Sequence, residues 1–273
     1  MPQTRANAID IEYETFGRER DPTVLLIMGF AASMLFWPDS LCEGLAAKAF
    51  RVVRFDNRDI GRSTHLKALE TPDLGAMVAE ARKGARPVPP YALDDMAADA
   101  AALLAALGVG KAHIVGASMG GMIAQLVAIN HSAQTKSLVS IMSTTARPGL
   151  PQAKPEAMAA LMAKPASESR EDLIANGIAI AHAIGSPGFR ASEAEIRAQR
   201  ARLVDWAPYD PAGIARQMAA IVAAAASPSS PSRMMRSPAL NATVCMKAPP
   251  DPLGRLQRAT FAGKAIDREG PDG

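Results

Sequence analysis

The sequence predicts an α/β fold in which a mostly parallel central sheet is flanked by helices. Short apolar runs alternate with helical patterns over residues 9–142, an arrangement typical of parallel sheets. A purely helical pattern follows over 152–226, and one more strand-like run lies at 239–247. We therefore expect three parts: an N-terminal part of the core at 1–146, a helical lid at 147–226, and a C-terminal part of the core at 227–273.

The first strands come early in the chain. Residues 9–17, IDIEYETFG, alternate between apolar and polar side chains, as half-buried strands do. Continuous apolar runs at 23–30 (TVLLIMGF) and 50–56 (FRVVRFD) predict two strands buried on both faces. Between them, residues 37–49 have helical spacing, and Pro38 suits the first turn of that helix.

The central elements continue the alternation. LDDMAADAAALLAAL at 93–107 predicts a helix that ends at Gly108. AHIVG at 112–116 and SLVSIM at 137–142 predict strands, and GMIAQLVAIN at 121–130 predicts the helix between them. Strands joined through helices in this way pair in parallel, so both belong in the same sheet.

The strand pattern stops after RPGLP at 147–151. The helical segments that follow are interrupted at Pro165, at 185–188 and at 208–211, which indicates an all-helical insertion. SPSSPS at 227–232 ends that insertion. The sheet then resumes briefly before the chain reaches a second cluster of prolines.

Composition excludes several classes of protein. The chain has 273 residues, of which 48% are hydrophobic and 21% charged, so a large core is expected rather than disorder. We find neither a signal-peptide apolar region nor eighteen consecutive apolar residues. We therefore expect no membrane association and a cytoplasmic location.

Charge and cysteine usage point away from nucleic acid, disulfides and metals. The net charge is +3, but residues 227–273 hold 7 Lys/Arg against 4 Asp/Glu, and the rest of the chain is balanced. Without a basic stripe on the main body, no nucleic-acid partner is expected. Cys42 and Cys245 are far apart and have no metal-ligand spacing around them, so we expect free thiols and no metal or organic cofactor.

Ser118 lies in the most informative stretch, Gly116-Ala117-Ser118-Met119-Gly120. This sequence fits G-x-S-x-G, the nucleophile elbow, in which a sharp strand-to-helix turn exposes a serine hydroxyl. The predicted strand before it and the predicted helix after it are the context that the motif requires. The alternatives are a packing turn whose serine caps the helix, and a dinucleotide loop, which lacks the G-x-G-x-x-G order.

A serine nucleophile also needs backbone donors for the oxyanion of its tetrahedral intermediate. The usual donors are the amide after the serine and an amide from the loop after an earlier strand. Met119 and Phe30 occupy these two places, since Met28-Gly29-Phe30 follows a predicted strand. An ordinary strand-to-loop turn is the alternative for the second place.

At these motifs the chain resembles the α/β-hydrolase family, and within it bacterial esterases similar to aclacinomycin methylesterase. The resemblance covers about residues 5–226 and is carried by LLIMGFAAS, RFDNRDIGRST, YALDDMAADAAALLAALGV, AHIVGASMGGMIAQ, SIMSTT, IGSPGF and YDPAGIARQMAAI. It implies Ser118 as nucleophile, the Phe30 and Met119 amides as the oxyanion hole, and a lid over an apolar acyl or polyketide-like substrate. The charged residues of the family's loop at 56–59 are expected to hold that loop in place.

The rest of the catalytic triad departs from the family's pattern of serine, acid and histidine. TVCMKAPPDPL at 243–253 resembles the stretch that carries the acid and places Asp251 there, although a surface-loop aspartate beside prolines is the alternative. The family's histidine follows the acid by roughly 25–30 residues. No histidine occurs in the 22 residues after Asp251, so we expect a truncated, frameshifted or diverged ending without the last strand and helix.

Four histidines occur elsewhere in the chain. His113 lies in the strand before the serine and His131 near the end of the following helix, so both are expected to be structural. His65 follows the loop at 56–64 and His182 lies in the lid, and either is an open alternative for the base. Neither is assigned that role.

Two functions stay open from the sequence. The first is a serine hydrolase that cleaves a small-molecule carboxylic ester or lactone with Ser118 and, as the candidate acid, Asp251. The second is a catalytically impaired member of the fold that at most binds an apolar ligand under its lid. Perhydrolysis and carbon–carbon bond hydrolysis are further chemistries that this fold supports.

Overall fold

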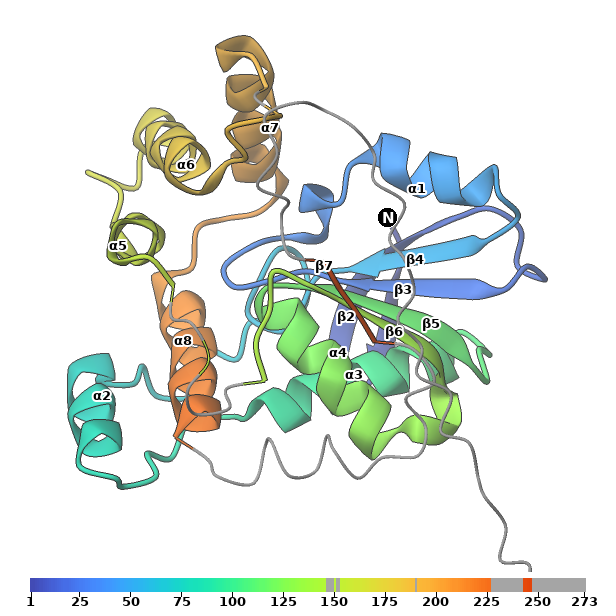
Figure 1. Cartoon of the computed structure of the whole chain (residues 1–273), viewed down its shortest axis with the longest axis horizontal. Helices are drawn as coiled ribbons and strands as arrows, with labels where there is room; N and C mark the ends of the chain where they lie inside the picture. Colours follow the sequence, from blue (N-terminus) through green and yellow to red (C-terminus); the bar gives the residue numbers. More distant parts are fainter. Residues whose placement is uncertain (146–149, 151–152, 190, 227–242, 247–273) are drawn as a thin grey trace, which may run out of the picture.

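A seven-stranded sheet forms the centre of the molecule, in the order β1-β2-β4-β3-β5-β6-β7. This computed structural model describes residues 1–145, 150, 153–189, 191–226 and 243–246. β1 and β2 pair antiparallel with each other, and β2 pairs antiparallel with β4. The remaining neighbours, from β4 through β7, are parallel (Figure 1). The predicted α/β fold with a mostly parallel sheet is therefore confirmed.

The elements follow the alternation of the sequence. The strands are β1 (Gln3–Ala6), β2 (Ile9–Phe16), β3 (Thr23–Ile27), β4 (Arg51–Phe55), β5 (Ala112–Ala117), β6 (Thr135–Ile141) and β7 (Thr243–Met246). The helices are η1 (Met34–Phe36), α1 (Asp39–Ala46), α2 (Leu74–Arg82), α3 (Leu93–Ala106), α4 (Met119–Asn130), η2 (Ser132–Gln134), α5 (Pro155–Met162), α6 (Arg170–Ile184), α7 (Glu193–Trp206) and α8 (Pro211–Ala225).

The sheet is covered on both faces, which explains why its central strands are apolar throughout. Leu25 and Ile27 of β3 belong to one hydrophobic cluster, which includes buried residues of α3 and α4. Val24 and Leu26 point the other way, into a second cluster with Trp37 and residues of α1. Successive strand residues face opposite sides, so a strand buried on both faces has no polar side.

Cys42 of α1 belongs to the second cluster and is fully buried. Burial raises the pKa of the Cys42 thiol, because the thiolate loses its hydration there. The thiol therefore acts as a small apolar side chain in this core.

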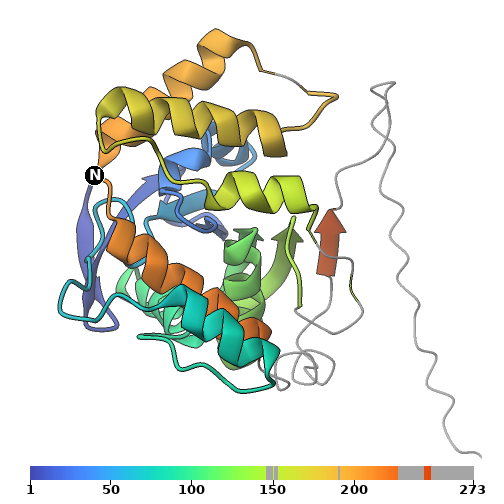
Figure 2. The ribbon, with the colours of Figure 1, turned by 90° about the vertical axis from the view of Figure 1, so that its left-hand side faces the viewer.

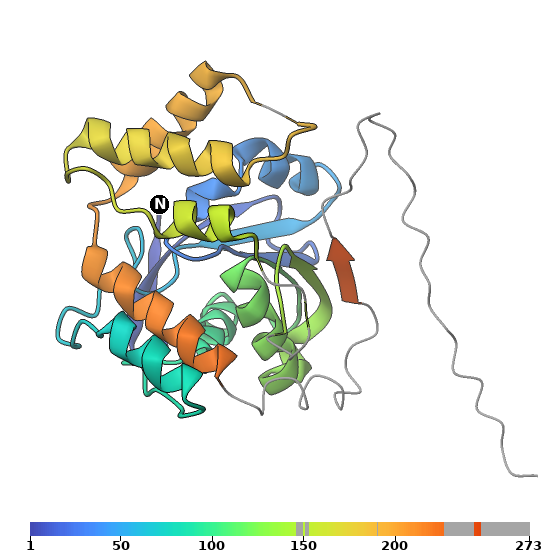
Figure 3. The ribbon, with the colours of Figure 1, turned by 60° about the vertical axis from the view of Figure 1, so that its left-hand side comes forward.

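Helices α5, α6, α7 and α8 make up the helical segment that follows the sheet's central part. They gather at the end of the sheet where β5 leads into α4 (Figures 1 and 3). α8 differs from the others, because it packs along α2 and also contacts α3 (Figure 2). Its Ala220 is part of the first hydrophobic cluster. One face of α8 is therefore continuous with the core.

One strand and one α-helix, β1 and α2, were absent from the sequence prediction, as were the short η1 and η2. β1 has only four residues, QTRA, and no alternation of apolar side chains, so its pairing with β2 is what makes it a strand. α2 buries only Met77 and is placed by its packing against α8. Both elements depend on tertiary contacts. In the described part of the chain, no helix is long and apolar enough to cross a membrane.

Candidate active site

Ser118 lies at the turn between β5 and α4, as the sequence predicts. Its φ of 55° and ψ of −123° lie in a region that residues with a side chain rarely adopt. The Ser118 N–H donates to the carbonyl of Ile141 at 2.9 Å, and its side chain is exposed. The turn therefore presents the hydroxyl outward while the neighbouring strand holds its backbone.

The glycines of the motif allow the strand and the helix to approach closely. A Cβ at Gly116 would lie 2.0 Å from the carbonyl oxygen of Gly120. A Cβ at Gly120 would lie 2.1 Å from the carbonyl oxygen of Ile27, at the end of β3. Both distances are far below van der Waals contact. The start of α4 consequently rests directly on the backbone of β3 and β5.

The loop after β3 approaches the serine equally closely. A Cβ at Gly29 would lie 3.0 Å from Cβ of Ser118 and 3.5 Å from its Oγ. Phe30 follows in the same loop, half-buried, and Met119 is the first residue of α4. The loop after β3 and the start of α4, which carry the two amides that the sequence predicts for the oxyanion hole, therefore meet at Ser118.

Asp56, in the charged loop after β4, connects three segments near this turn. Asp56 is fully buried and accepts hydrogen bonds from the backbone N–H of Met34 at 2.7 Å and of Arg62 at 2.9 Å. It also accepts one from Nε1 of Trp206 at 2.8 Å. One carboxylate thus joins the loop after β3, its own loop and the end of α7.

The other polar residues of this loop are also paired in the interior. Asn57 donates from Nδ2 to the carbonyl of Met28 at 2.9 Å. The Arg58 guanidinium binds both carboxylate oxygens of Asp99 on α3, at 2.6 and 2.7 Å. Buried polar groups of this kind are stable only when paired. Their hydrogen bonds give them structural roles.

Asp59 and Arg216 form the most deeply buried ion pair of this region. Arg216 donates from Nε and from a terminal nitrogen to the two oxygens of Asp59, each at 2.8 Å. The two side chains are 1% and 0% exposed. This pair connects α8 to the loop after β4, and nothing in the sequence marks two residues 157 positions apart as partners.

His65 is held by two oxygen acceptors. Its Nδ1 lies 2.5 Å from Oδ2 of Asp210 and its Nε2 lies 3.1 Å from the carbonyl oxygen of Gly61. Both ring nitrogens are therefore next to acceptors other than Ser118. The geometry therefore makes His65 part of a structural junction and argues against its service as the base.

Asp210 completes that junction. Burial by itself would raise its pKa, but hydrogen bonds from the Gly213 N–H and His65, with the nearby Arg216 charge, hold the pKa below its usual value. The ionised Asp210 carboxylate therefore stabilises the folded protein. This contribution is fully present above the pKa of Asp210 in the unfolded chain, about 4, and is lost as the pH falls through the lower pKa of the folded state.

The remaining histidines lie in other places. Nδ1 of His113 is 2.7 Å from Oγ of Ser137, and burial lowers the pKa of His113. His131 follows the last residue of α4, about 20 Å along the helix from Ser118. His182 is exposed on α6 and pairs with Glu193 at 2.8 Å. None of the four histidines pairs with Ser118 in the described part of the chain.

Asp59, His65 and Asp210 are also the one group of histidine, cysteine and acidic side chains among the described residues whose possible ligand atoms all lie within 4.8 Å of one another. Arg216 binds both oxygens of Asp59 and lies 3.8 Å from Asp210. The guanidinium already supplies the positive charge that these carboxylates need. The donor set therefore fits an ion-pair junction better than a metal centre.

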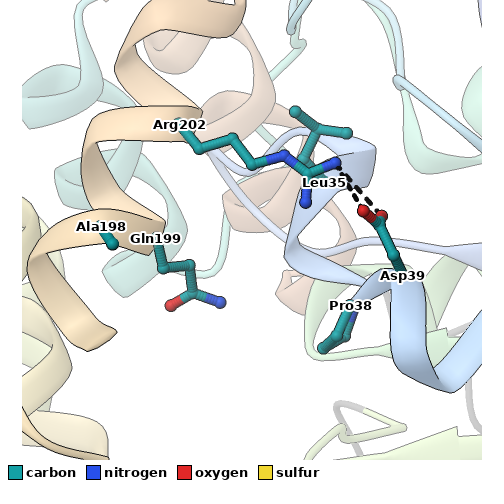
Figure 4. A pocket seen from close by; sticks show the side chains of 6 residues that line it. All are labelled: Leu35, Pro38, Asp39, Ala198, Gln199 and Arg202. Carbon is teal, nitrogen blue, oxygen red and sulfur yellow. Dashed lines mark hydrogen bonds and ion pairs between the residues drawn. The ribbon is translucent and has the colours of Figure 1, made fainter.

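A cavity of about 310 Å³ lies between α7 and the segment from η1 to α1. It is lined by Leu35, Pro38, Asp39, Ala198, Gln199 and Arg202. Figure 4 shows Arg202 reaching across its edge to Asp39, to which it is bonded at 3.0 Å. Ser118, Phe30 and Met119 do not line this cavity. Asp251, the candidate acid, falls outside the described residues.

The strained backbone at Ser118 leads to a prediction about stability. Replacing Ser118 by glycine should give a protein more stable than the Ser118→Ala variant by about 1 kcal/mol, because glycine adopts positive φ without strain. Chemical denaturation of the two variants measures the difference. Equal stabilities would show that the turn at Ser118 is unstrained.

Comparisons with known proteins agree with this geometry. The family described as alpha/beta hydrolase fold matches residues 22–181. Rhodomycin D methylesterase DauP of Streptomyces sp. (strain C5) is 38% identical over 118 residues, which are 43% of this chain and 33% of that protein. For rhodomycin D methylesterase DnrP of Streptomyces peucetius the identity is 37%, with the same coverage. The match thus spans one third of the length of these relatives.

Solved structures show the same fold. The enol-lactonase from Burkholderia xenovorans LB400 superposes with a TM-score of 0.52 at 22% identity, over 81% of this chain and 73% of that one. At this identity the likeness concerns the fold alone. The family match covers more than half of the sequence, and the sheet order and the glycine-flanked Ser118 turn agree with it. This chain therefore belongs to the α/β-hydrolase family.

Proposed function

We propose that this protein is a serine hydrolase that cleaves a small-molecule carboxylic ester, with Ser118 as the nucleophile. The observation that carries the proposal is an exposed serine in a strained strand-to-helix turn, with the Gly29 backbone packed against it. Backbone strain lowers stability and is typical of functional sites. A serine that only caps a helix would not need a strained backbone, and the Ser118 side chain forms no capping hydrogen bond.

The main-chain amides of Phe30 and Met119 are the proposed oxyanion hole. Met119 is the first residue of α4, so its N–H has no acceptor within the helix. The amino end of a helix also carries partial positive charge, which favours a developing oxyanion. Phe30 follows Gly29, whose backbone lies against Ser118. Both amides belong to segments that meet at the nucleophile.

The reaction would proceed in two steps. Oγ of Ser118 attacks the ester carbonyl carbon, the bond between that carbon and the alkoxy oxygen breaks, and the alcohol leaves with the proton that the Ser118 hydroxyl gave up. Water then attacks the acyl-serine and releases the carboxylic acid. The methylesterase names of the two Streptomyces relatives support a carboxylic ester as substrate. A lactone is a cyclic ester and reacts by the same steps. Asp251 remains the proposed acid.

The histidines favour a second candidate function. Three of them have side-chain partners away from Ser118, and the fourth lies at the far end of α4. A nucleophile elbow without its base loses most of its rate, although the oxyanion hole retains some. The second candidate is therefore a hydrolase-fold protein that binds an apolar ligand without appreciable turnover.

Intact-mass analysis after treatment with a fluorophosphonate separates the two functions. Such probes react with a serine that has an activated hydroxyl and a formed oxyanion hole. We expect one adduct on the unchanged protein and none on Ser118→Ala. Ser40→Ala is the matched control, because Ser40 is an exposed serine in the ordinary backbone of α1 and its loss should leave the adduct in place.

Hydrolysis of short-chain aryl esters by the same three proteins completes the test. Turnover that disappears in Ser118→Ala and persists in Ser40→Ala supports the serine hydrolase. A folded protein that forms no adduct, with equal ester hydrolysis in all three, would contradict it and support the second candidate.

A further inference from the structure

Three buried side chains hold residues 28–34, the loop after β3 together with the first residue of η1, which we call the oxyanion loop. Asn57 binds the carbonyl of Met28 at 2.9 Å, and Asp56 accepts the N–H of Met34 at 2.7 Å. At the middle of the loop, Oε1 of Gln217 accepts the N–H of Ala31 at 3.0 Å. The first two side chains come from the loop after β4, whereas Gln217 comes from α8, 186 residues away in sequence.

The hydrogen bond from Ala31 acts directly beside the proposed oxyanion donor. Ala31 has a φ of 54°, a conformation that a non-glycine residue keeps only when its surroundings impose it. The peptide plane between Phe30 and Ala31 shares the Phe30 α-carbon with the plane that carries the Phe30 N–H. Fixing the Ala31 N–H leaves φ and ψ of Phe30 as the only rotations between the two planes, and the hydrogen bond from Asn57 to the carbonyl of Met28 holds the chain on the other side of Phe30.

Gln217 is itself fixed in orientation. Its side chain is fully buried, and its Nε2 donates to the carbonyl of Arg58 at 2.9 Å. An amide that faces an N–H on one side and a carbonyl on the other satisfies both in one orientation only. The neighbouring Arg216 binds Asp59 and so holds α8 against the loop after β4. This ion pair also fixes the position of Gln217 relative to that loop.

We propose that Gln217 is a positioning residue for the oxyanion loop, through which α8 sets the direction of the Phe30 N–H toward Ser118. This inference rests on the serine hydrolase function proposed above. The hydrogen bonds of the Gln217 side chain are to Ala31 and Arg58, so it acts through the Ala31 N–H. Its loss leaves the nucleophile in place and misaligns one donor of the oxyanion hole.

Gln217→Met tests the proposal, because methionine has a similar length and makes neither hydrogen bond. We expect the second-order rate constant of fluorophosphonate labelling to fall by about 100-fold, the effect of a small misplacement at a reacting centre. We also expect hydrogen exchange of the backbone amides at 28–34 to accelerate by about 10-fold, since a protecting hydrogen bond is lost.

Two further variants keep the result interpretable. Gln217→Glu retains an acceptor for the Ala31 N–H and should recover part of the labelling rate. Gln134→Met removes a hydrogen bond from Nε2 to the carbonyl of Ala101, at the amino end of β6. It should change neither the labelling nor the exchange at 28–34. Thermal melting identifies any variant that does not fold.

The two measurements separate this inference from the proposed function. If the unchanged protein forms no adduct, the hydrolase function fails, and hydrogen exchange still decides whether Gln217 fixes the loop. Unchanged exchange at 28–34 in folded Gln217→Met would overturn the inference whatever the activity. Faster exchange with an unchanged labelling rate would overturn it too, because the held loop would then not serve the reaction.

Discussion

Replacing Arg216 by methionine is expected to lower the free energy of unfolding by about 3–5 kcal/mol. The substitution leaves the Asp59 carboxylate without its partner, and Asp59 is fully buried. The hydrogen bond that Asp59 still accepts from the Leu66 N–H, at 2.7 Å, replaces only part of the hydration that the buried charge has lost. Denaturation by urea, followed by circular dichroism, measures the change.

A surface pair of the same geometry provides the control. Arg170 donates from Nε and a terminal nitrogen to both oxygens of Asp205, at 2.6 and 2.7 Å, but both side chains are about half exposed. Water replaces the lost partner there, so Arg170→Met should leave stability nearly unchanged. The double variant Asp59→Asn with Arg216→Met should be more stable than Arg216→Met alone, because no charge remains unpaired. Similar losses for Arg216→Met and Arg170→Met would refute the argument from burial.

Gly120→Ala is expected to destabilise the protein by about 3 kcal/mol and to abolish labelling of Ser118. The new methyl group would lie 2.1 Å from the carbonyl oxygen of Ile27 and 2.7 Å from that of Met28. Both neighbours are backbone atoms at the end of β3, so no side chain can move aside. The start of α4 must shift away from the sheet, and Ser118 shifts with it.

Gly44→Ala is the matched control for this prediction. Gly44 also lies within a helix, α1, and a Cβ there would meet no atom within 4 Å. Alanine favours the helix more than glycine, so stability should rise by about 0.5–1 kcal/mol. A Gly120→Ala protein as stable as the unchanged one, with intact labelling, would contradict the steric argument.

The pattern of apolar residues in the sequence was sufficient to predict most strands of the sheet. The run at 23–30 becomes β3, Thr23–Ile27, and the helix predicted at 93–107 is α3, Leu93–Ala106. A strand that is buried on both faces needs apolar side chains at every position, so the sequence of that strand alone is enough to predict it. β1 and α2 carry no such signal, because pairing and packing with distant segments define them.

The sequence by itself determined the strand-to-helix turn at Ser118, because this turn depends on close-packed glycines that lie within two residues of it. Only the tertiary structure decided what surrounds that turn. Asp59 with Arg216, His65 with Asp210, and Gln217 with Ala31 join residues more than 140 positions apart. The packing of α8 on the core brings these partners together. The sequence alone does not reveal which distant residue pairs with a buried polar group, because the pair exists only in the folded structure.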